Sequence, residues 1–139
     1  MKNKTLIIIA FAICALILLL LIAPIPLSGT KGVHIVSSVQ TSQGQFENDT
    51  EMELVRLNGT LVNDGDITAE NFKLSVVFID DAHDKVVIRT IYENVDLLPN
   101  SEHVMSFESE YLRGKTIPKT SVNTTLQLEW MEDGVLKQG

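Results

Sequence analysis

The sequence predicts an all-β domain that follows a single apolar segment, and three observations lead to this fold class. Residues 6–22 are uninterruptedly apolar, whereas the composition from Thr30 onward is that of an ordinary soluble domain. Several later segments alternate apolar and polar residues with a period of two, which is typical of strands with one buried face. Clusters of Gly, Asn, Asp and Pro separate these segments, and no amphipathic helical pattern occurs beyond the apolar run.

The N-terminal segment has the length and composition of a transmembrane helix. It follows Lys2 and Lys4, begins at Leu6 and continues without a charge to Leu27. A helix needs about 20 apolar residues to cross the hydrocarbon core of a bilayer. We therefore expect residues 1–27 to form a cytoplasmic stub and a membrane anchor, with the membrane contacts running from Leu6 to Leu27.

Two other interpretations of this segment remain open. A cleaved signal peptide usually has an apolar core of about 7–15 residues followed by small residues at the cleavage site. Here the core is longer, Leu27 stands where a small residue is preferred, and Pro24 would block cleavage after Ala23. A prepilin-type anchor also has a basic start and an apolar helix, but Thr5 follows Lys4 and no glutamate appears early in the helix. The uncleaved anchor is the favoured interpretation.

The basic residues before the anchor predict the topology. The positive-inside rule keeps Lys2 and Lys4 in the cytoplasm and exports the rest of the chain. Residues 28–32 are polar and include two glycines, so we expect a linker there. Residues 33–139 then form one extracytoplasmic domain, and the expected localisation is the cell membrane with a single pass.

The charges divide unevenly along the chain. All 18 acidic residues lie at Glu47 or later, whereas two of the 11 basic residues precede the apolar run. The exported part therefore has nine basic and 18 acidic side chains, a formal charge of −9. Such a surface repels nucleic acid and anionic lipid headgroups, so no nucleic-acid partner is expected. The negative charge is consistent with a surface that is simply solvated or with a basic binding partner.

The single cysteine, Cys14, lies inside the apolar run. The domain after it has no cysteine, which excludes disulfides, thiolate zinc sites and a cysteine nucleophile there. A domain of about 100 residues can bury enough apolar surface to fold without disulfides.

The alternating segments define six or seven strands. The first strand is expected at Val33, Ile35 and Val39, and the later ones over residues 55–61, 72–78 and 86–95, at Met105 and Phe107, and over residues 122–130. In the strand over residues 55–61, one face carries Val55, Leu57, Gly59 and Leu61. In the strand over residues 72–78, the residues expected to face inward are Phe72, Leu74, Val76 and Phe78. Residues 40–50 are polar and are expected to form a loop, and turns are expected at residues 63–66, 80–84 and 99–101. This pattern favours an immunoglobulin-like antiparallel β-sandwich preceded by one N-terminal transmembrane helix, with a closed barrel as the alternative.

A family resemblance covers residues 55–107. Residues 57–66 read apolar–x–Gly–x–apolar–apolar–Asn–x–Gly, and Asp80-Asp81, Leu97-Leu98-Pro99 and Phe107 follow at fitting distances. This pattern resembles the FxLYD and CARDB-like family of small immunoglobulin-like domains of prokaryotic envelope proteins. The chain departs from the family where Phe78-Ile79-Asp80 replaces Phe-Tyr-Asp and where Asn100 replaces a turn glycine, although asparagine tolerates the left-handed conformation. The resemblance implies a fold and an envelope location, and no catalytic activity.

No pattern in the sequence indicates catalysis or a cofactor. The three histidines, His34, His83 and His103, lie on different expected elements and lack metal-ligand spacing. The sequence contains no nucleophile elbow, phosphate-binding loop, dinucleotide fingerprint or zincin motif. We therefore expect no catalytic residues, no cofactor and no enzymatic function.

Two acidic turns are candidate calcium ligands. One contains Asp64 and Asp66, and the other contains Asp80, Asp81 and Asp84. Calcium prefers six to eight oxygen ligands, often loop carboxylates. The favoured interpretation is that no metal binds, because aspartate is common in turns where it bonds its own backbone.

Four Asn-x-Ser/Thr sequons occur, at Asn3, Asn48, Asn58 and Asn123. Asn3 is cytoplasmic in the predicted topology, whereas Asn48 lies in a polar stretch and the other two fall on outward faces of expected strands. These three are candidate glycosylation sites in a host that glycosylates exported proteins. Chance occurrence is the alternative.

Two functions fit these features. The first is a binding or adhesion module that holds an envelope protein or a surface polymer near the membrane. The second is a structural accessory subunit whose anchor pairs with other membrane helices. The anchor is poor in the small and polar residues that pair helices, which favours the first function. Trp130 is expected to face the core with Leu126 and Leu128, rather than to anchor an interface.

Overall fold

The computed structural model describes residues 31–139. The predicted anchor, residues 1–27, and residues 28–30 of the predicted linker lie outside the described residues. Between residues 31 and 139 no helix is both long and apolar enough to cross a bilayer. This part of the chain consists of strands and one short 3-10 helix, η1 (Asp81–His83), so the prediction of an all-β domain is confirmed.

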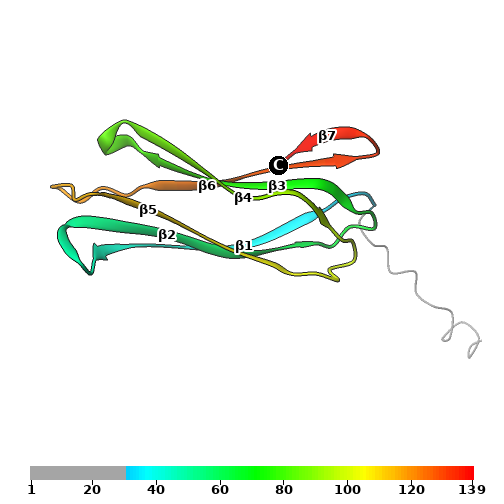
Figure 1. The fold of residues 1–139 in the computed structure, drawn as a ribbon, viewed down its shortest axis with the longest axis horizontal. Coiled ribbons are helices and arrows are strands. Elements are labelled where there is room, and N and C mark those ends of the chain that lie inside the picture. The colour runs from blue at the N-terminus through cyan, green and yellow to red at the C-terminus, as the bar shows by residue number, and fades with distance from the viewer. Residues whose placement is uncertain (1–30) are drawn as a thin grey trace, which may run out of the picture.

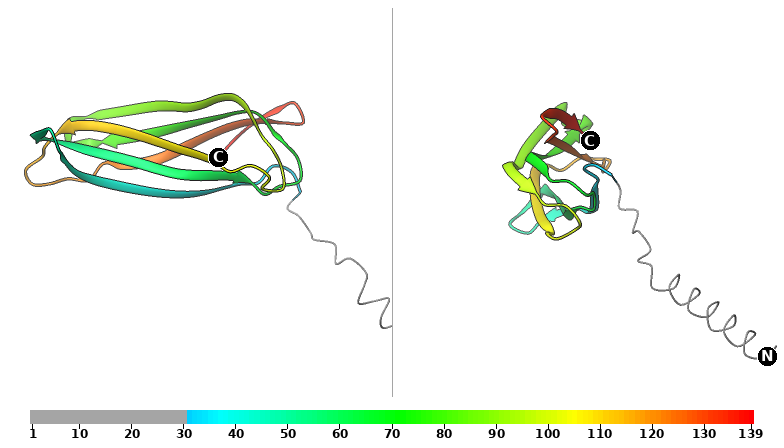
Figure 2. Two further views of the ribbon diagram at one scale, coloured as in Figure 1. Left: turned by 60° about the horizontal axis from the view of Figure 1, so that its bottom comes forward. Right: turned by 90° about the vertical axis from the view of Figure 1, so that its right-hand side faces the viewer.

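The strands form two antiparallel sheets. β1 (Ile35–Phe46), β2 (Asp49–Asn63) and β5 (Met105–Gly114) make a three-stranded sheet in the order β1-β2-β5. β4 (Lys85–Leu97), β3 (Ala69–Asp80), β6 (Asn123–Glu132) and β7 (Val135–Gln138) make a four-stranded sheet in the order β4-β3-β6-β7. The sheets stack as two elongated layers (Figures 1 and 2), which confirms the predicted β-sandwich.

The prediction of a loop over residues 40–50 is wrong. β1 continues to Phe46, the chain turns at Glu47 and Asn48, and every residue of β1 pairs with β2, with a register shift between Gln45 and Phe46. The polar composition of this stretch has a physical reason, because β1 is an edge strand and nearly all of its side chains are exposed. Strand pairing here comes from the backbone and from the apolar face of β2, not from an apolar face on β1.

The core lies between the sheets, where the predicted alternation places it. Its buried hydrophobic residues are Val55, Leu57, Leu61, Ala69, Phe72, Leu74, Val76, Phe78, Leu97, Phe107, Tyr111 and Val122. The inward face predicted for residues 72–78 is therefore confirmed. Gly59 leaves room for the ring of Phe107, since a Cβ there would lie 2.8 Å from that ring and 2.3 Å from the Ser38 carbonyl oxygen. Trp130 is partly buried and packs against the core, as expected.

The start of the described chain is hydrogen-bonded to one end of the sandwich. The Gly32 N–H donates to the Asp66 carboxylate at 2.6 Å, and the Asp66 N–H donates to the Gly32 carbonyl at 3.1 Å. The Val33 N–H donates to Glu132 at 3.4 Å. Gly65 makes this approach feasible, because a Cβ at that position would lie 2.0 Å from the Gly32 carbonyl oxygen. The predicted turn over residues 63–66 thus receives the incoming chain.

The turn over residues 99–101 is also confirmed. Asn100 has a φ of 59° and Ser101 a φ of 55°, both in the left-handed region. The Asn100 N–H donates to the Gly65 carbonyl at 2.9 Å. Asparagine therefore fills the position where the resembled family often has glycine, without loss of the turn.

Candidate functional site

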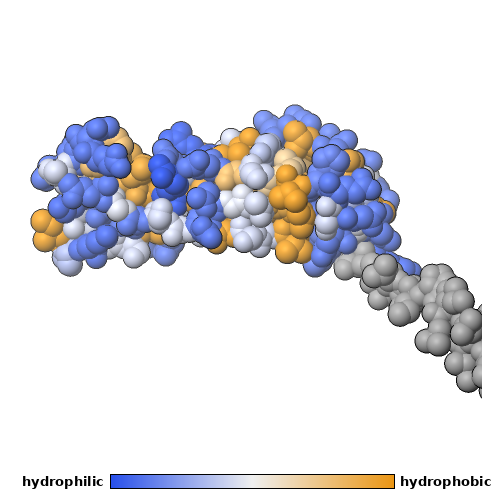
Figure 3. Space-filling view, turned by 90° about the horizontal axis from the view of Figure 1, so that it is seen from below, coloured by the Kyte–Doolittle hydropathy of each residue, from blue (hydrophilic) through white to orange (hydrophobic). Residues whose placement is uncertain are grey.

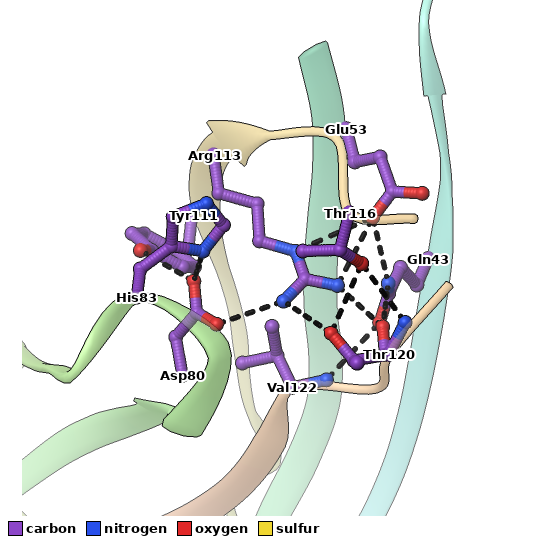
Figure 4. Close-up of polar contacts among 9 residues, drawn as sticks. All are labelled: Gln43, Glu53, Asp80, His83, Tyr111, Arg113, Thr116, Thr120 and Val122. Atoms are coloured by element: carbon purple, nitrogen blue, oxygen red, sulfur yellow. Dashed lines mark hydrogen bonds and ion pairs between the residues drawn. The ribbon is translucent and has the colours of Figure 1, made fainter. Parts of the chain in front are cut away.

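A buried charged network lies at the end of the sandwich opposite the incoming chain (Figures 1 and 4). Its centre is Arg113 on β5, whose side chain is 1% exposed. The guanidinium lies 3.0 Å from Glu53 of β2 and 2.8 Å from Asp80 of β3. Because Glu53 belongs to the three-stranded sheet and Asp80 to the four-stranded sheet, the network joins the two layers.

Asp80 accepts hydrogen bonds from three side chains. Besides Arg113, these are the Tyr111 hydroxyl at 2.9 Å and His83 Nδ1 at 2.9 Å. Burial raises the pKa of the Asp80 carboxyl, but the hydrogen bonds from Tyr111, Arg113 and His83 lower it by more, so the net pKa lies below the ordinary value. Burial and the hydrogen bond to Asp80 raise the pKa of Tyr111. The carboxylate and the neutral phenol are therefore the stable forms.

The network also fixes the loop that follows β5. Arg113 donates to both the hydroxyl and the carbonyl of Thr120, the first at 3.3 Å. The Thr120 N–H donates to the Thr116 hydroxyl at 2.9 Å, which closes the loop on itself. Gln43 of β1 donates to the Thr120 carbonyl at 2.8 Å and accepts from the Val122 N–H at 3.2 Å. Strands β1 and β5 thus hold this loop from both sides (Figure 4).

The fixed loop presents an apolar side chain to solvent. Ile117 is 93% exposed, more than any other large exposed hydrophobic residue of the described chain. Lys115 and Lys119 flank it, and both are exposed. The Lys115 N–H donates to the Glu51 carbonyl at 2.8 Å, so the loop is also tied to β2. We call residues 115–119 the tip loop.

The network is suited to positioning rather than to chemistry. Among residues 31–139 every buried side-chain nitrogen and oxygen has a hydrogen-bond partner. Both carboxylates of the network are occupied by Arg113, and His83 is bonded to Asp80. The arrangement therefore holds the two sheets and the loop after β5 in one geometry.

The five aspartates proposed as calcium ligands are not brought together. Asp64 pairs with His34 and Asp66 accepts from Gly32, at the end where the chain enters the sandwich. Asp80 is buried in the network at the other end, and Asp81 begins η1 there. Asp84 ends η1 with a left-handed φ of 50°. Among the described residues no group of three His, Cys, Asp or Glu side chains could hold a metal ion. These turns give the calcium hypothesis no support.

The three candidate sequons all have exposed asparagines. Asn48 lies in the β1–β2 turn, and Asn123 is the first residue of β6. Asn58 lies on the outer face of the three-stranded sheet, in a hollow of about 500 Å³ that Gln40 and Glu108 also line. The predicted outward direction of Asn58 and Asn123 is confirmed, while their glycosylation stays a prediction.

The charged network was not predicted, although the sequence contains a signal for it. Glu53 shares the inward face of β2 with Val55 and Leu57, and Arg113 shares that of β5 with Phe107 and Tyr111. A glutamate and an arginine at inward positions of two strands indicate a buried pair. The strands pair in register such that Glu53 lies opposite Arg113, which only the structure shows.

Comparisons with known proteins inform the fold alone. No family model matches the chain, and no curated protein matches it. Among solved structures, the crystal structure of a Bordetella pertussis protein assigned as ApaA is similar, with a TM-score of 0.58 and 12% sequence identity. The match covers 79% of this chain and 89% of that chain. At this identity the similarity supports a shared β-sandwich architecture and carries no function.

Proposed function

We propose that the chain is a membrane-anchored, extracytoplasmic immunoglobulin-like domain that serves, without enzymatic activity, as a binding or adhesion module of the cell envelope. Residues 6–27 would span the membrane once, with the N-terminus in the cytoplasm. The three-plus-four strand arrangement and the domain length support the immunoglobulin-like part of the proposal. The motif of residues 57–66 supports the relation to FxLYD and CARDB-like domains.

One observation carries the binding role. The chain enters the sandwich at one end, and the tip loop is fixed at the opposite end (Figure 1). An anchored domain would therefore present Ile117 away from the membrane, at the place where a partner can reach it. A large exposed apolar residue held in one geometry lowers the entropy lost on binding. Its flanking lysines, on a domain that is otherwise acidic, suit an envelope protein or polymer with acidic groups.

The buried network supports the same role. Burying charges is expensive, and apolar replacements of buried ion pairs are often equally stable. A domain that needed only stability would therefore gain nothing from Arg113, Glu53 and Asp80. Their geometry instead specifies one conformation of the tip loop, which a binding surface needs and a passive cap does not.

Co-purification tests the proposal and separates it from the accessory-subunit alternative. The full chain would be purified in mild detergent from its native membranes, together with an Ile117→Asp variant. The control is Leu136→Asp, because Leu136 on β7 is 57% exposed and β7 lies at the other end of the sandwich (Figure 1). We expect the wild type and Leu136→Asp to retain a common partner and Ile117→Asp to lose it. Equal retention by all three would instead indicate that the anchor makes the contact.

A further inference from the structure

The outer face of the three-stranded sheet carries a row of valines. Val36 of β1 pairs with Val62 of β2, and Val104 directly precedes Met105, which pairs with the neighbouring Leu61. Val104 is 62% exposed and Val36 is 41% exposed. Figure 3 shows an apolar band across this face, near the end where the chain enters the sandwich. The row runs across β1 and β2 to the residue that precedes β5, and within residues 31–139 no other element covers Val36 or Val104.

The next row along the strands is also uncharged. It contains Ser38, Thr60 and Ser106, which are paired with one another across β1, β2 and β5. Together the two rows form what we call the uncharged strip. Charged side chains on this face begin further on, at Glu108, Arg56 and Glu110, where Arg56 pairs with both glutamates.

The strip lies close to the point where the chain is held. Gly32 is fixed by its two hydrogen bonds with Asp66, and Val36 follows four residues later. At about 3.3 Å per residue, the strip lies about 13 Å from Gly32. Only residues 28–31 separate Leu27 from Gly32, so this tether spans at most about 17 Å when extended. The strip therefore lies within about 30 Å of a membrane that holds residues 6–27.

The charge pattern of the domain favours this end over the rest of the face as a membrane contact. The exported part carries a formal charge of −9, and the glutamates of the outer face would be repelled by phosphate headgroups. The uncharged strip avoids that repulsion and offers apolar area at the edge of the bilayer. At its rim, His34 Nδ1 is hydrogen-bonded to the Asp64 carboxylate.

We propose that the uncharged strip rests on the lipid interface of the membrane that holds the anchor, so that the sandwich tilts with its three-stranded sheet toward the bilayer and its tip loop away from it. This inference rests on the proposed function, because it requires residues 6–27 to span the membrane. It commits to a zwitterionic lipid surface as the occupant of the strip. The tilt leaves the tip loop accessible to a partner.

Site-directed fluorescence in liposomes tests this orientation. The full chain with Cys14→Ser has no other cysteine, so a single label can be introduced at Val104→Cys or, as the control, at Leu112→Cys. Leu112 is 43% exposed and lies near the far end of β5, eight residues after Val104 and so at the same parity along the chain. Each variant would carry an environment-sensitive fluorophore and be reconstituted into phosphatidylcholine vesicles. Quenching by nitroxide-labelled lipid and by aqueous iodide would then be compared.

We expect the label at position 104 to be quenched by nitroxide lipid at least threefold more strongly than the label at position 112, and to be shielded from iodide. Equal access of iodide to both positions, in protein that floats with the vesicles, would overturn the inference and leave the anchor intact. Equal lipid quenching at both positions would overturn it as well, because the whole face would then lie on the bilayer. Failure to float would refute the anchor itself.

A second variant tests the valines directly. Val104→Asp places a charge in the strip at a position that is already exposed, so the thermal midpoint of the domain should not change. With the label at Val36→Cys, this substitution should restore iodide access by at least threefold. Unchanged lipid quenching at position 36 would show that the valine row does not make the contact.

Discussion

Arg113 and Asp80 lie 2.8 Å apart across the two sheets of the sandwich, and each side chain is 1% exposed. The same guanidinium pairs with Glu53 at 3.0 Å, so one arginine is shared by two buried carboxylates. β5 and β3 belong to different sheets, and the pair therefore couples the layers at the end that carries the tip loop. Loss of the arginine would leave two buried carboxylates without their cationic partner, Asp80 held only by Tyr111 and His83 and Glu53 only by Gln43.

Replacing Arg113 with leucine should therefore destabilise the domain strongly. Removing one partner of a buried ion pair typically costs about 3–5 kcal/mol, against a total stability of about 5–15 kcal/mol for a small domain. Chemical denaturation of both proteins measures the difference. Arg56→Leu is the matched control, because Arg56 pairs with Glu108 and Glu110 in solvent and such pairs contribute little. Equal losses in the two variants would contradict the role of the buried network.

Stability should fall in acid in a way that depends on Asp80. Its folded pKa lies below the ordinary value, so its contribution is present above the unfolded pKa of about 3.9 and is lost as the pH falls through the folded pKa. Asp80→Asn removes this contribution at all pH values. The difference in unfolding free energy between wild type and variant should thus be larger at about pH 5 than at about pH 3, because it shrinks below about pH 4. A difference that stays constant down to pH 2 would contradict the assigned pKa direction.

The contact of Gly65 with the incoming chain gives a third prediction. Gly65→Ala should destabilise the domain by about 1–3 kcal/mol, the usual range for overpacking, because the new Cβ would lie 2.0 Å from the Gly32 carbonyl oxygen. Gly44→Ala is the control, since no atom lies within 4 Å of a Cβ built there. Thermal unfolding of the two variants should give a lower midpoint only for Gly65→Ala. Identical midpoints would show that the chain is not held at this turn.

The core and the outward faces follow from alternation, which is why they could be predicted from the sequence. The inward residues of Phe72 to Phe78 and of Val55 to Leu61 alternate along their strands and are buried as predicted, although Ser75 and Val77 on the other face of β3 are buried too. β1 could not be predicted beyond Val39, because an edge strand needs no apolar face and its polar residues read as a loop. The local sequence predicts which side chains of a strand are buried. It does not predict the backbone hydrogen bonds by which a polar edge strand pairs with its neighbour.

The buried network illustrates the other limit. Its residues come from strands that are far apart in sequence, with Glu53 and Arg113 sixty positions apart. The alternation of apolar and polar residues predicts that the side chains of Glu53 and Arg113 face inward. Which charged side chain each of them pairs with depends on the order and register of the strands, which the alternation does not give. The same limit applies to the aspartates that the sequence places together in turns, because neighbours in the sequence can have different surroundings in the fold. Asp80 ends a strand and is buried, whereas Asp81 beside it is exposed.

The sequons give a fourth prediction. We expect at least one of Asn48, Asn58 and Asn123 to carry a glycan in a native host with the required machinery, because all three are exposed. Asn3 should never be modified, since it lies on the cytoplasmic side of the proposed anchor. Intact-mass measurement of the protein from its native membranes decides this. A mass equal to the bare polypeptide in such a host would remove the prediction.

The central claim is that the tip of the sandwich faces the outside of the cell, and labelling of intact cells tests it most directly. The variant Ile117→Cys, in a chain that also carries Cys14→Ser, would be treated with a membrane-impermeant maleimide. Position 117 is 93% exposed, so the maleimide can label it without unfolding of the domain. Lys4→Cys serves as the cytoplasmic control. The account predicts that position 117 is labelled in intact cells and position 4 only after lysis. Protection of position 117 until lysis would contradict the placement of the domain outside the cytoplasm.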